Sequence, residues 1–223
     1  MSVDAIVALK ARSQSKMRLA SMLGDTAREA LVEAMAVDVL SCLLTHPEIE
    51  AVHVISGAGW SDGGPLPRGI TLWQESDWPV NGLIQAYELM TEKSAAEGLL
   101  FLHADLPCLD QESLSAVIEA SAERHAVLCP DHADVGTNAV LRWRDQPLPL
   151  CFGNDSLRRH QHAADVAGVP WRIARRPGLS LDIDVPADLD RVRLGDALIG
   201  ERTSAWFHGY QVDLTVDATQ HAL

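Results

Sequence analysis

The chain has 223 residues, enough for one well-buried domain or at most two small ones. Its net charge of −13 argues against a general nucleic-acid-binding protein, which needs a positive surface along the phosphate backbone. No apolar run approaches the roughly 18 residues of a membrane span, and the N-terminus lacks the pattern of a secretory signal. We therefore expect a cytoplasmic protein without a membrane partner, whose four scattered cysteines are free thiols.

Short apolar runs alternate with amphipathic segments through the first 130 residues. A capping box of Thr26 and Glu29 predicts the start of the first long helix, which continues to about residue 46. Further helices are expected at 81–93 and 113–124. Buried strands are expected at 5–9, 51–56, 70–73, 98–102 and 126–129.

After residue 130 the pattern predicts a strand at 138–143, a helix at 156–167, a strand at 181–185 and a helix at 186–193. The alternation of strands and helices predicts an α/β sandwich with a mainly parallel sheet. We assign residues 1–195 to this domain. Residues 196–223 have weak periodicity and could be a tail, an arm onto a partner subunit, or disordered.

Four polar segments fall where strands are expected to end, and in open α/β sheets ligands bind outside the carboxyl ends of the strands. The first segment holds Lys10, Arg12, Lys16 and Arg18 directly after the first strand. These cations could hold nucleotide phosphates through charge-assisted hydrogen bonds, although a solvated surface loop is an equally weighted alternative. The segment lacks the glycines of a Walker A or Rossmann turn, which argues against those folds.

Carboxylates make up the next two segments. Asp105 follows the strand at 98–102, where it could bind a hard cation or merely form a turn or helix cap. Asp182 and Asp184 are two residues apart, so on a strand they would point to the same face. Two such carboxylates repel each other unless a cation lies between them. A solvent-facing strand could carry the pair, but together with Asp105 the three favour a metal site.

The fourth segment combines Thr137 and Asn138 with a helix start at Gly153 and Ser156. Free N–H groups at the start of a helix favour an anion. Ser156 is also expected to be the N-cap residue, with His160 one turn further along the same helix face.

One further motif is set aside. Gly57-Ala58-Gly59 follows a strand and begins like GxGxxG, but Asp62 stands at the sixth position and a Gly/Pro-rich loop follows. A dehydrogenase is therefore not expected.

In their order and spacing, these motifs resemble the 2-phospho-L-lactate guanylyltransferase family, of the CofC/FbiD type, from coenzyme F-420 biosynthesis. The resemblance covers about residues 6–189 and implies a single-domain, glycosyltransferase-A-like nucleotidyltransferase with a three-layer sandwich. The matching pieces are Leu9-Lys10 with Lys16-Met17-Arg18-Leu19-Ala20, His103-Ala104-Asp105-Leu106-Pro107, Gly136-Thr137-Asn138-Ala139, Phe152-Gly153 with Ser156 and His160, and Leu181-Asp182-Ile183-Asp184-Val185-Pro186-Ala187-Asp188-Leu189.

The resemblance implies a Mg²⁺-dependent enzyme that joins GMP from GTP to a small phosphorylated carboxylic acid and releases pyrophosphate. Phosphoenolpyruvate, 2-phospho-L-lactate and 3-phosphoglycerate all remain open as acceptors, and so does a homodimer. It further implies Asp105, Asp182 and Asp184 as metal ligands that carry catalysis with Lys16. The implied nucleotide contacts are Leu9, Lys10, Lys16, Arg18 and Gln85, and the implied acceptor contacts are Thr137, Asn138, Gly153, Ser156 and His160.

The chain departs from the family pattern at two places. Ile84 follows Leu83 where an Asn is usual. If that Asn helps to hold the nucleotide, either Asn81 or Gln85 substitutes for it or the base preference is relaxed. Met17 stands where a serine is usual, which removes one hydroxyl from the basic loop.

Three other functions stay open at this point. A nucleotidyltransferase acting on a sugar phosphate or molybdopterin usually carries a Gly-rich loop after the first strand, which is absent here. A glycosyltransferase normally has its Asp-x-Asp motif mid-chain, whereas Asp182 and Asp184 come late. A non-catalytic nucleotide-binding module would not need three convergent carboxylates.

Overall fold

Seven strands form one sheet, in the order β3-β2-β1-β4-β6-β5-β7. The computed structural model describes residues 2–60, 65–77, 82–194 and 198–217. In the described part of the chain β6 alone runs antiparallel to its neighbours, so the predicted mainly parallel mixed sheet is confirmed. The strands are β1 Val3–Leu9, β2 Ile49–Ser56, β3 Thr71–Gln74, β4 Gly98–Leu102, β5 Ala126–Pro130, β6 Thr137–Trp143 and β7 Trp171–Ile173.

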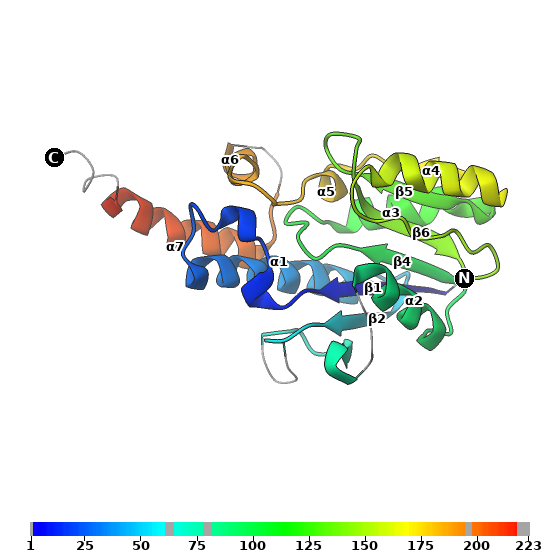
Figure 1. The fold of residues 1–223 in the computed structure, drawn as a ribbon, viewed down its shortest axis with the longest axis horizontal. Helices are drawn as coiled ribbons and strands as arrows, with labels where there is room; N and C mark the ends of the chain where they lie inside the picture. Colours follow the sequence, from blue (N-terminus) through cyan, green and yellow to red (C-terminus); the bar gives the residue numbers. More distant parts are fainter. Residues whose placement is uncertain (1, 61–64, 78–81, 195–197, 218–223) are drawn as a thin grey trace.

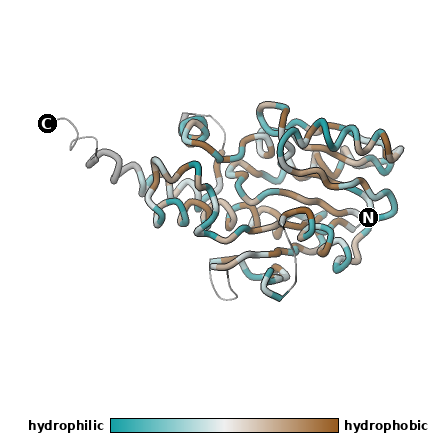
Figure 2. The backbone as a smooth tube through the Cα atoms, viewed as in Figure 1, coloured by the Kyte–Doolittle hydropathy of each residue, from teal (hydrophilic) through white to brown (hydrophobic). Residues whose placement is uncertain are grey.

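Helices cover both faces of the sheet, which gives the three layers seen in Figure 1. Both faces of the sheet are apolar and need such a cover, as strand β1 illustrates. Ala5, Val7 and Leu9 pack with α1 and α3 on one face, whereas Ile6 lies on the opposite face and packs with α2. Figure 2 shows the resulting hydrophobic strands between helices with more hydrophilic outer faces. The helices are α1 Asp25–Thr45, α2 Leu83–Lys93, α3 Gln111–Ala120, α4 Ser156–Ala167, α5 Pro177–Ser180, α6 Pro186–Leu194 and α7 Glu201–Asp217.

A third apolar cluster lies beyond the sheet, between α1, α6 and α7. It includes Met35 of α1, Leu189 of α6 and Phe207 of α7, and the Trp206 indole N–H donates to the Ala27 carbonyl (3.0 Å). Residues 201–217, for which the sequence left three options open, thus form a helix beside α1 (Figure 1). The division of the chain at residue 195 stays a prediction, and residues 195–197 lie outside the described ranges.

The predicted capping box of the first helix is wrong. Helix α1 begins at Asp25 after an extended Gly24, so Thr26 already lies inside the first turn and cannot cap it. The first turn is instead fixed by Arg28, whose buried guanidinium donates to the Asp25 carboxylate (2.8 Å).

The helix expected at 113–124 is shorter and begins earlier. Asp110 caps it by accepting a hydrogen bond from the Ser113 N–H (2.7 Å), so α3 starts at Gln111. It ends at Ala120, because Glu123 has a left-handed backbone (φ 60°) that no α-helix continues. No helix in the described ranges is long and apolar enough to cross a bilayer.

Candidate active site

Three strand ends meet at one edge of the sheet and gather the predicted site residues. Strands β1 and β4 are parallel neighbours, so the segments after Leu9 and Leu102 leave from the same edge. Strand β6 runs the other way, which brings its first residue, Thr137, to that edge as well. The His103 N–H donates to the Asn138 carbonyl (3.1 Å) and ties the two segments together.

Asp105, Asp182 and Asp184 converge at this edge, each offering an oxygen within 4.8 Å of the others. The strand predicted at 181–185 is wrong, since this described segment has no regular secondary structure and joins no sheet. It is anchored instead by the Asp188 carboxylate, which accepts hydrogen bonds from the N–H groups of Asp184 and Val185 (both 2.9 Å).

The Lys16 ammonium lies within the carboxylate cluster. It donates hydrogen bonds to Asp105 and, at 2.5 Å, to Asp184 Oδ1. Burial alone would lower the pKa of Lys16, but the charges of Asp105 and Asp184 outweigh it and raise that pKa to about 12. Burial likewise opposes ionisation of Asp105, yet the Lys16 charge, followed by His103, lowers the pKa of Asp105.

Asp182 has the opposite shift. Burial first, and then the charges of Asp105 and Asp184, raise the pKa of Asp182. Its Oδ1 atom accepts a hydrogen bond from Asn138 Nδ2 (3.4 Å), which also donates to the Leu179 carbonyl (3.0 Å). Asn138, predicted as an acceptor contact, is buried and links the segment of Asp182 to the Leu179 carbonyl.

The cluster fits a hard divalent cation. Its donors are carboxylate oxygens, the ligands that Mg²⁺ and Mn²⁺ prefer. The buried Oδ1 atom of Asp105 has no hydrogen-bond partner among the described residues. An unsatisfied buried carboxylate oxygen is costly, and a bound cation beside it would remove that cost.

Residues 10–19 form a loop of two short 3₁₀ turns, Arg12–Gln14 and Met17–Leu19, at the mouth of the site. Lys10 and Arg18 are exposed and make no ion pair with a described residue, whereas Arg12 pairs with Glu33. Lys16 itself has a left-handed backbone (φ 54°), which turns its side chain back toward the cluster.

Arg28 of α1 holds this loop through hydrogen bonds to its backbone carbonyls. Its buried guanidinium donates to the carbonyls of Ser13 (3.2 Å) and Ser15. On the other side Gly57 approaches so closely that a Cβ atom there would lie 2.7 Å from the Ala11 nitrogen. Gly57, the first glycine of the Gly57-Ala58-Gly59 motif, therefore allows the basic loop to pack closely against the end of β2.

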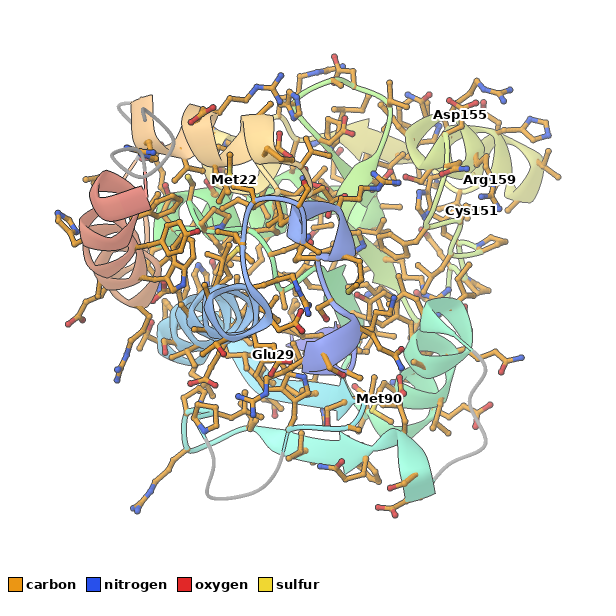
Figure 3. All side chains as sticks on the ribbon, turned by 60° about the vertical axis from the view of Figure 1, so that its left-hand side comes forward. Met22, Glu29, Met90, Cys151, Asp155 and Arg159 are labelled. Atoms are coloured by element: carbon orange, nitrogen blue, oxygen red, sulfur yellow. The ribbon has the colours of Figure 1, made fainter. Side chains whose placement is uncertain are left out.

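The start of α4 lies beside Thr137. Gly153 has a φ of +113°, which side-chain-bearing residues rarely adopt. The prediction that Ser156 is the N-cap residue is wrong: Asp155 holds that position, with a left-handed backbone (φ 59°) and without a capping side-chain bond. Ser156 is the buried first residue of the helix. Figure 3 labels Asp155 just before α4, Arg159 on the first turn of that helix, and Cys151 on the segment that precedes it.

His160 is completely buried on α4. Its Nδ1 atom lies 3.2 Å from Thr137 Oγ1, and its Nε2 atom accepts a hydrogen bond from the Cys151 N–H (2.8 Å). Burial first of all, together with the nearby charge of Arg159, lowers the pKa of His160 to about 4, so the ring is neutral near pH 7.

A comparison with known proteins identifies the chain. The sequence profile of the guanylyl transferase CofC-like family matches residues 3–220. The chain belongs to this family.

Curated relatives agree with the CofC-like assignment. A phosphoenolpyruvate guanylyltransferase of Sphaerobacter thermophilus is 34% identical over 204 residues, which cover 90% of this chain and 96% of the relative. One of Conexibacter woesei is also 34% identical, and the match covers 86% of this chain and 88% of the relative.

Solved structures show that the CofC-like chain has a nucleotidyltransferase fold. A Desulfovibrio desulfuricans protein described as a nucleotide-diphospho-sugar transferase superposes with a TM-score of 0.76 at 15% identity, over 95% of this chain and 96% of that protein. A Mycobacterium tuberculosis protein in complex with manganese superposes with a TM-score of 0.57 at 16% identity, over 86% of this chain and 98% of that one.

The supporting roles of two residues at this CofC-like site, Arg28 and Asp188, are not predicted from the sequence. Arg28 interrupts the apolar face that Leu31 and Met35 continue, and a cation on such a face is the signal that could have found it. Asp188 follows the Asp-x-Asp pair at the first turn of α6, where a carboxylate can hold free N–H groups. Gln85 lies exposed on α2, and Asn81 lies outside the described residues.

Proposed function

We propose that this chain transfers GMP from GTP to phosphoenolpyruvate, with release of pyrophosphate, as a step of coenzyme F-420 biosynthesis. The names of the relatives at 34% identity favour this acceptor over the other two acids. The observation that carries the proposal is the convergence of Asp105, Asp182, Asp184 and Lys16, which the first two residues of β6 connect to α4: Asn138 bonds to Asp182, and Thr137 contacts His160. That arrangement offers an acidic centre for a metal–nucleotide complex next to a helix start suited to an anionic acceptor.

Asp105, Asp182 and Asp184 are the residues that would hold Mg²⁺. When bound, the ion supplies positive charge that offsets repulsion between two phosphate groups and stabilises the leaving pyrophosphate. The structural neighbour in complex with manganese supports use of a divalent ion. Asn138 orients Asp182, and Asp188 fixes the segment that carries Asp184, so both ligands are held before the substrate arrives.

The reaction needs no general base. A phosphate oxygen of the acceptor is already anionic near neutral pH and attacks the α-phosphorus of GTP, while the bond from that phosphorus to the bridging oxygen of pyrophosphate breaks. The obstacle is charge repulsion, which Lys16 lowers from within the site. Lys10 and Arg18, both exposed on the basic loop, would contact the β- and γ-phosphates.

The acceptor would lie between Thr137 and the first turn of α4. The backbone N–H groups of the left-handed Gly153 and of Ser156, the first residue of the helix, would bind its phosphate or carboxylate, whereas the Leu157 N–H already donates to the Val135 carbonyl (3.1 Å). The Thr137 hydroxyl adds a side-chain hydrogen bond from β6.

The product identifies both substrates. Purified protein with Mg²⁺ is given each pairing of GTP, ATP, CTP or UTP with phosphoenolpyruvate, 2-phospho-L-lactate or 3-phosphoglycerate, and the products are identified by mass spectrometry. We expect the mass of guanylylated phosphoenolpyruvate as the main product. A product with another acid would correct the acceptor, and absence of any nucleotidylated acid would contradict the proposal.

A further inference from the structure

His160 connects the separate pieces of the proposed acceptor pocket without reaching its surface. The ring contacts Thr137 on β6 and the Cys151 N–H two residues before Gly153. It also packs edge-on against the Phe152 ring, with 5.1 Å between the ring centres. Through one buried side chain, the strand and the loop of the pocket are held in a fixed relation.

The hydrogen bonds of His160 determine where its proton lies. Nε2 accepts from the Cys151 N–H, so in the neutral ring Nε2 carries no hydrogen and Nδ1 carries the only one. The Ser156 carbonyl is a second acceptor facing the ring and favours a proton on it, so Ser156 and Thr137 share the Nδ1–H. Thr137 Oγ1, 3.2 Å from Nδ1, can therefore only accept from the ring.

This assignment leaves the Thr137 hydroxyl proton directed away from His160. A hydroxyl has one proton and two lone pairs, and the ring N–H engages one of those lone pairs. Thr137 is the first residue of β6 and lies at the edge where the acceptor would enter. The hydroxyl is thus prepared as a donor to an anionic oxygen.

We propose that His160 is a positioning residue of the acceptor pocket, whose Nδ1–H orients the Thr137 hydroxyl to donate to the phosphate or carboxylate of the acceptor. The inference rests on the proposed function for the identity of that ligand. His160 has no exposed surface and would act through Thr137, which is itself buried but keeps an exposed fraction of 2% at the end of the strand.

Two amide variants separate the two hydrogen bonds of the ring. In His160→Asn the amide N–H₂ can take the place of Nδ1 and still donate to Thr137. In His160→Gln the amide oxygen can reach the position of Nε2 and accept from Cys151, but no donor faces Thr137. We expect His160→Gln to raise the acceptor KM about tenfold, the effect of one lost hydrogen bond, with kcat and the GTP KM little changed. His160→Asn should keep the acceptor KM within about threefold of wild type.

Thr137→Val tests whether His160 acts through the hydroxyl. In that background His160→Gln should raise the acceptor KM no further, because the oriented group is already gone. The proposal would be overturned if the acceptor KM of the double variant rose by the product of the increases seen in the two single variants. It would also be overturned if the acceptor KM rose equally in His160→Asn and His160→Gln and in proportion to the loss of thermal stability. That result would indicate a purely structural role of His160.

Nitrogen-15 NMR of the wild-type imidazole tests the inference independently of turnover. A signal with the proton on Nδ1 supports the orientation of Thr137. A proton on Nε2 would overturn it, because Thr137 would then donate to the ring. Absence of turnover in the wild type would count against the proposed function, whereas turnover with a proton on Nε2 would count against the role of His160 alone.

Discussion

The Lys16 ammonium lies 2.5 Å from Asp184 Oδ1 and also donates to Asp105, so a lysine occupies the centre of the carboxylate cluster. It contacts two of the three carboxylates, but its single positive charge offsets only one of their negative charges. A divalent cation bound to Asp105 Oδ1, the oxygen that Lys16 leaves without a partner, would lie next to this ammonium and repel it, so that the ammonium would turn toward the phosphates of the nucleotide. Metal and nucleotide are therefore expected to bind together.

Removal of the Lys16 charge should strengthen metal binding and weaken catalysis. In nucleotide-free Lys16→Met we expect an Mn²⁺ affinity about tenfold higher than in wild type, because no ammonium competes for the carboxylates, and a large loss of turnover. Titration of Mn²⁺ followed by electron paramagnetic resonance measures the affinity. Lys93→Met, at the last residue of α2, is the control. An unchanged Mn²⁺ affinity in Lys16→Met would contradict the competition.

The three carboxylates should be essential for turnover but not for folding. We expect Asp105→Asn, Asp182→Asn and Asp184→Asn each to lower kcat by about 10²–10³-fold, corresponding to about 3–4 kcal/mol of lost stabilisation. Steady-state kinetics at saturating Mg²⁺ measures the effect, and circular dichroism checks the fold. Asp190→Asn, at an exposed position of α6, should leave kcat unchanged. Turnover like wild type in any of the three variants would refute its role as a ligand.

Arg28 should affect GTP binding from a distance. Arg28→Met leaves the carbonyls of the basic loop without their buried donor, so the loop loosens and the GTP KM should rise about tenfold. Arg28 donates to three carbonyls in all, because it also reaches that of Arg12 (3.4 Å). Arg144 is the control, since it likewise donates to three carbonyls, those of Thr91, Ser94 and Ala96, beside the start of β4. Arg144→Met should lower the thermal stability but leave the GTP KM unchanged. A GTP KM in Arg28→Met that stays at the wild-type value, or that rises no more than in Arg144→Met, would contradict a role of Arg28 in holding the loop.

The buried His160 predicts acid sensitivity. Its pKa is about 4 in the folded protein and about 6.5 in the unfolded chain, so the unfolded state binds the proton more tightly. This contribution to stability is present above about pH 6.5 and is lost as the pH falls toward 4. Its magnitude is roughly 3 kcal/mol.

Urea unfolding between pH 4 and pH 7 measures this loss. His160→Asn carries no titrating ring, so its stability should fall less than that of wild type over the same interval. Arg159 and His103, which also act on the His160 ring, are present in both proteins. Parallel stability curves for the two proteins would contradict the shifted pKa.

The fold class and the convergence of the three carboxylates could be predicted from the sequence. Parallel strands end at one edge, so motifs placed after such strands converge even when local structure is predicted wrongly. The Asp182–Asp184 pair illustrates the limit: a spacing of two residues fits a strand, but the segment is held by the Asp188 side chain instead. His160 shows a second limit, because its burial depends on β6 and α4 packing together, which helical spacing alone does not show.

The most direct test of the account is the stoichiometry of pyrophosphate release. Purified protein is mixed with GTP and phosphoenolpyruvate in the presence of Mg²⁺, and pyrophosphate is followed with a coupled assay. The account predicts one pyrophosphate for each guanylylated acceptor, no release when either substrate is omitted, and no release in EDTA. Release from GTP alone, or a reaction that continues at full rate in EDTA, would contradict it.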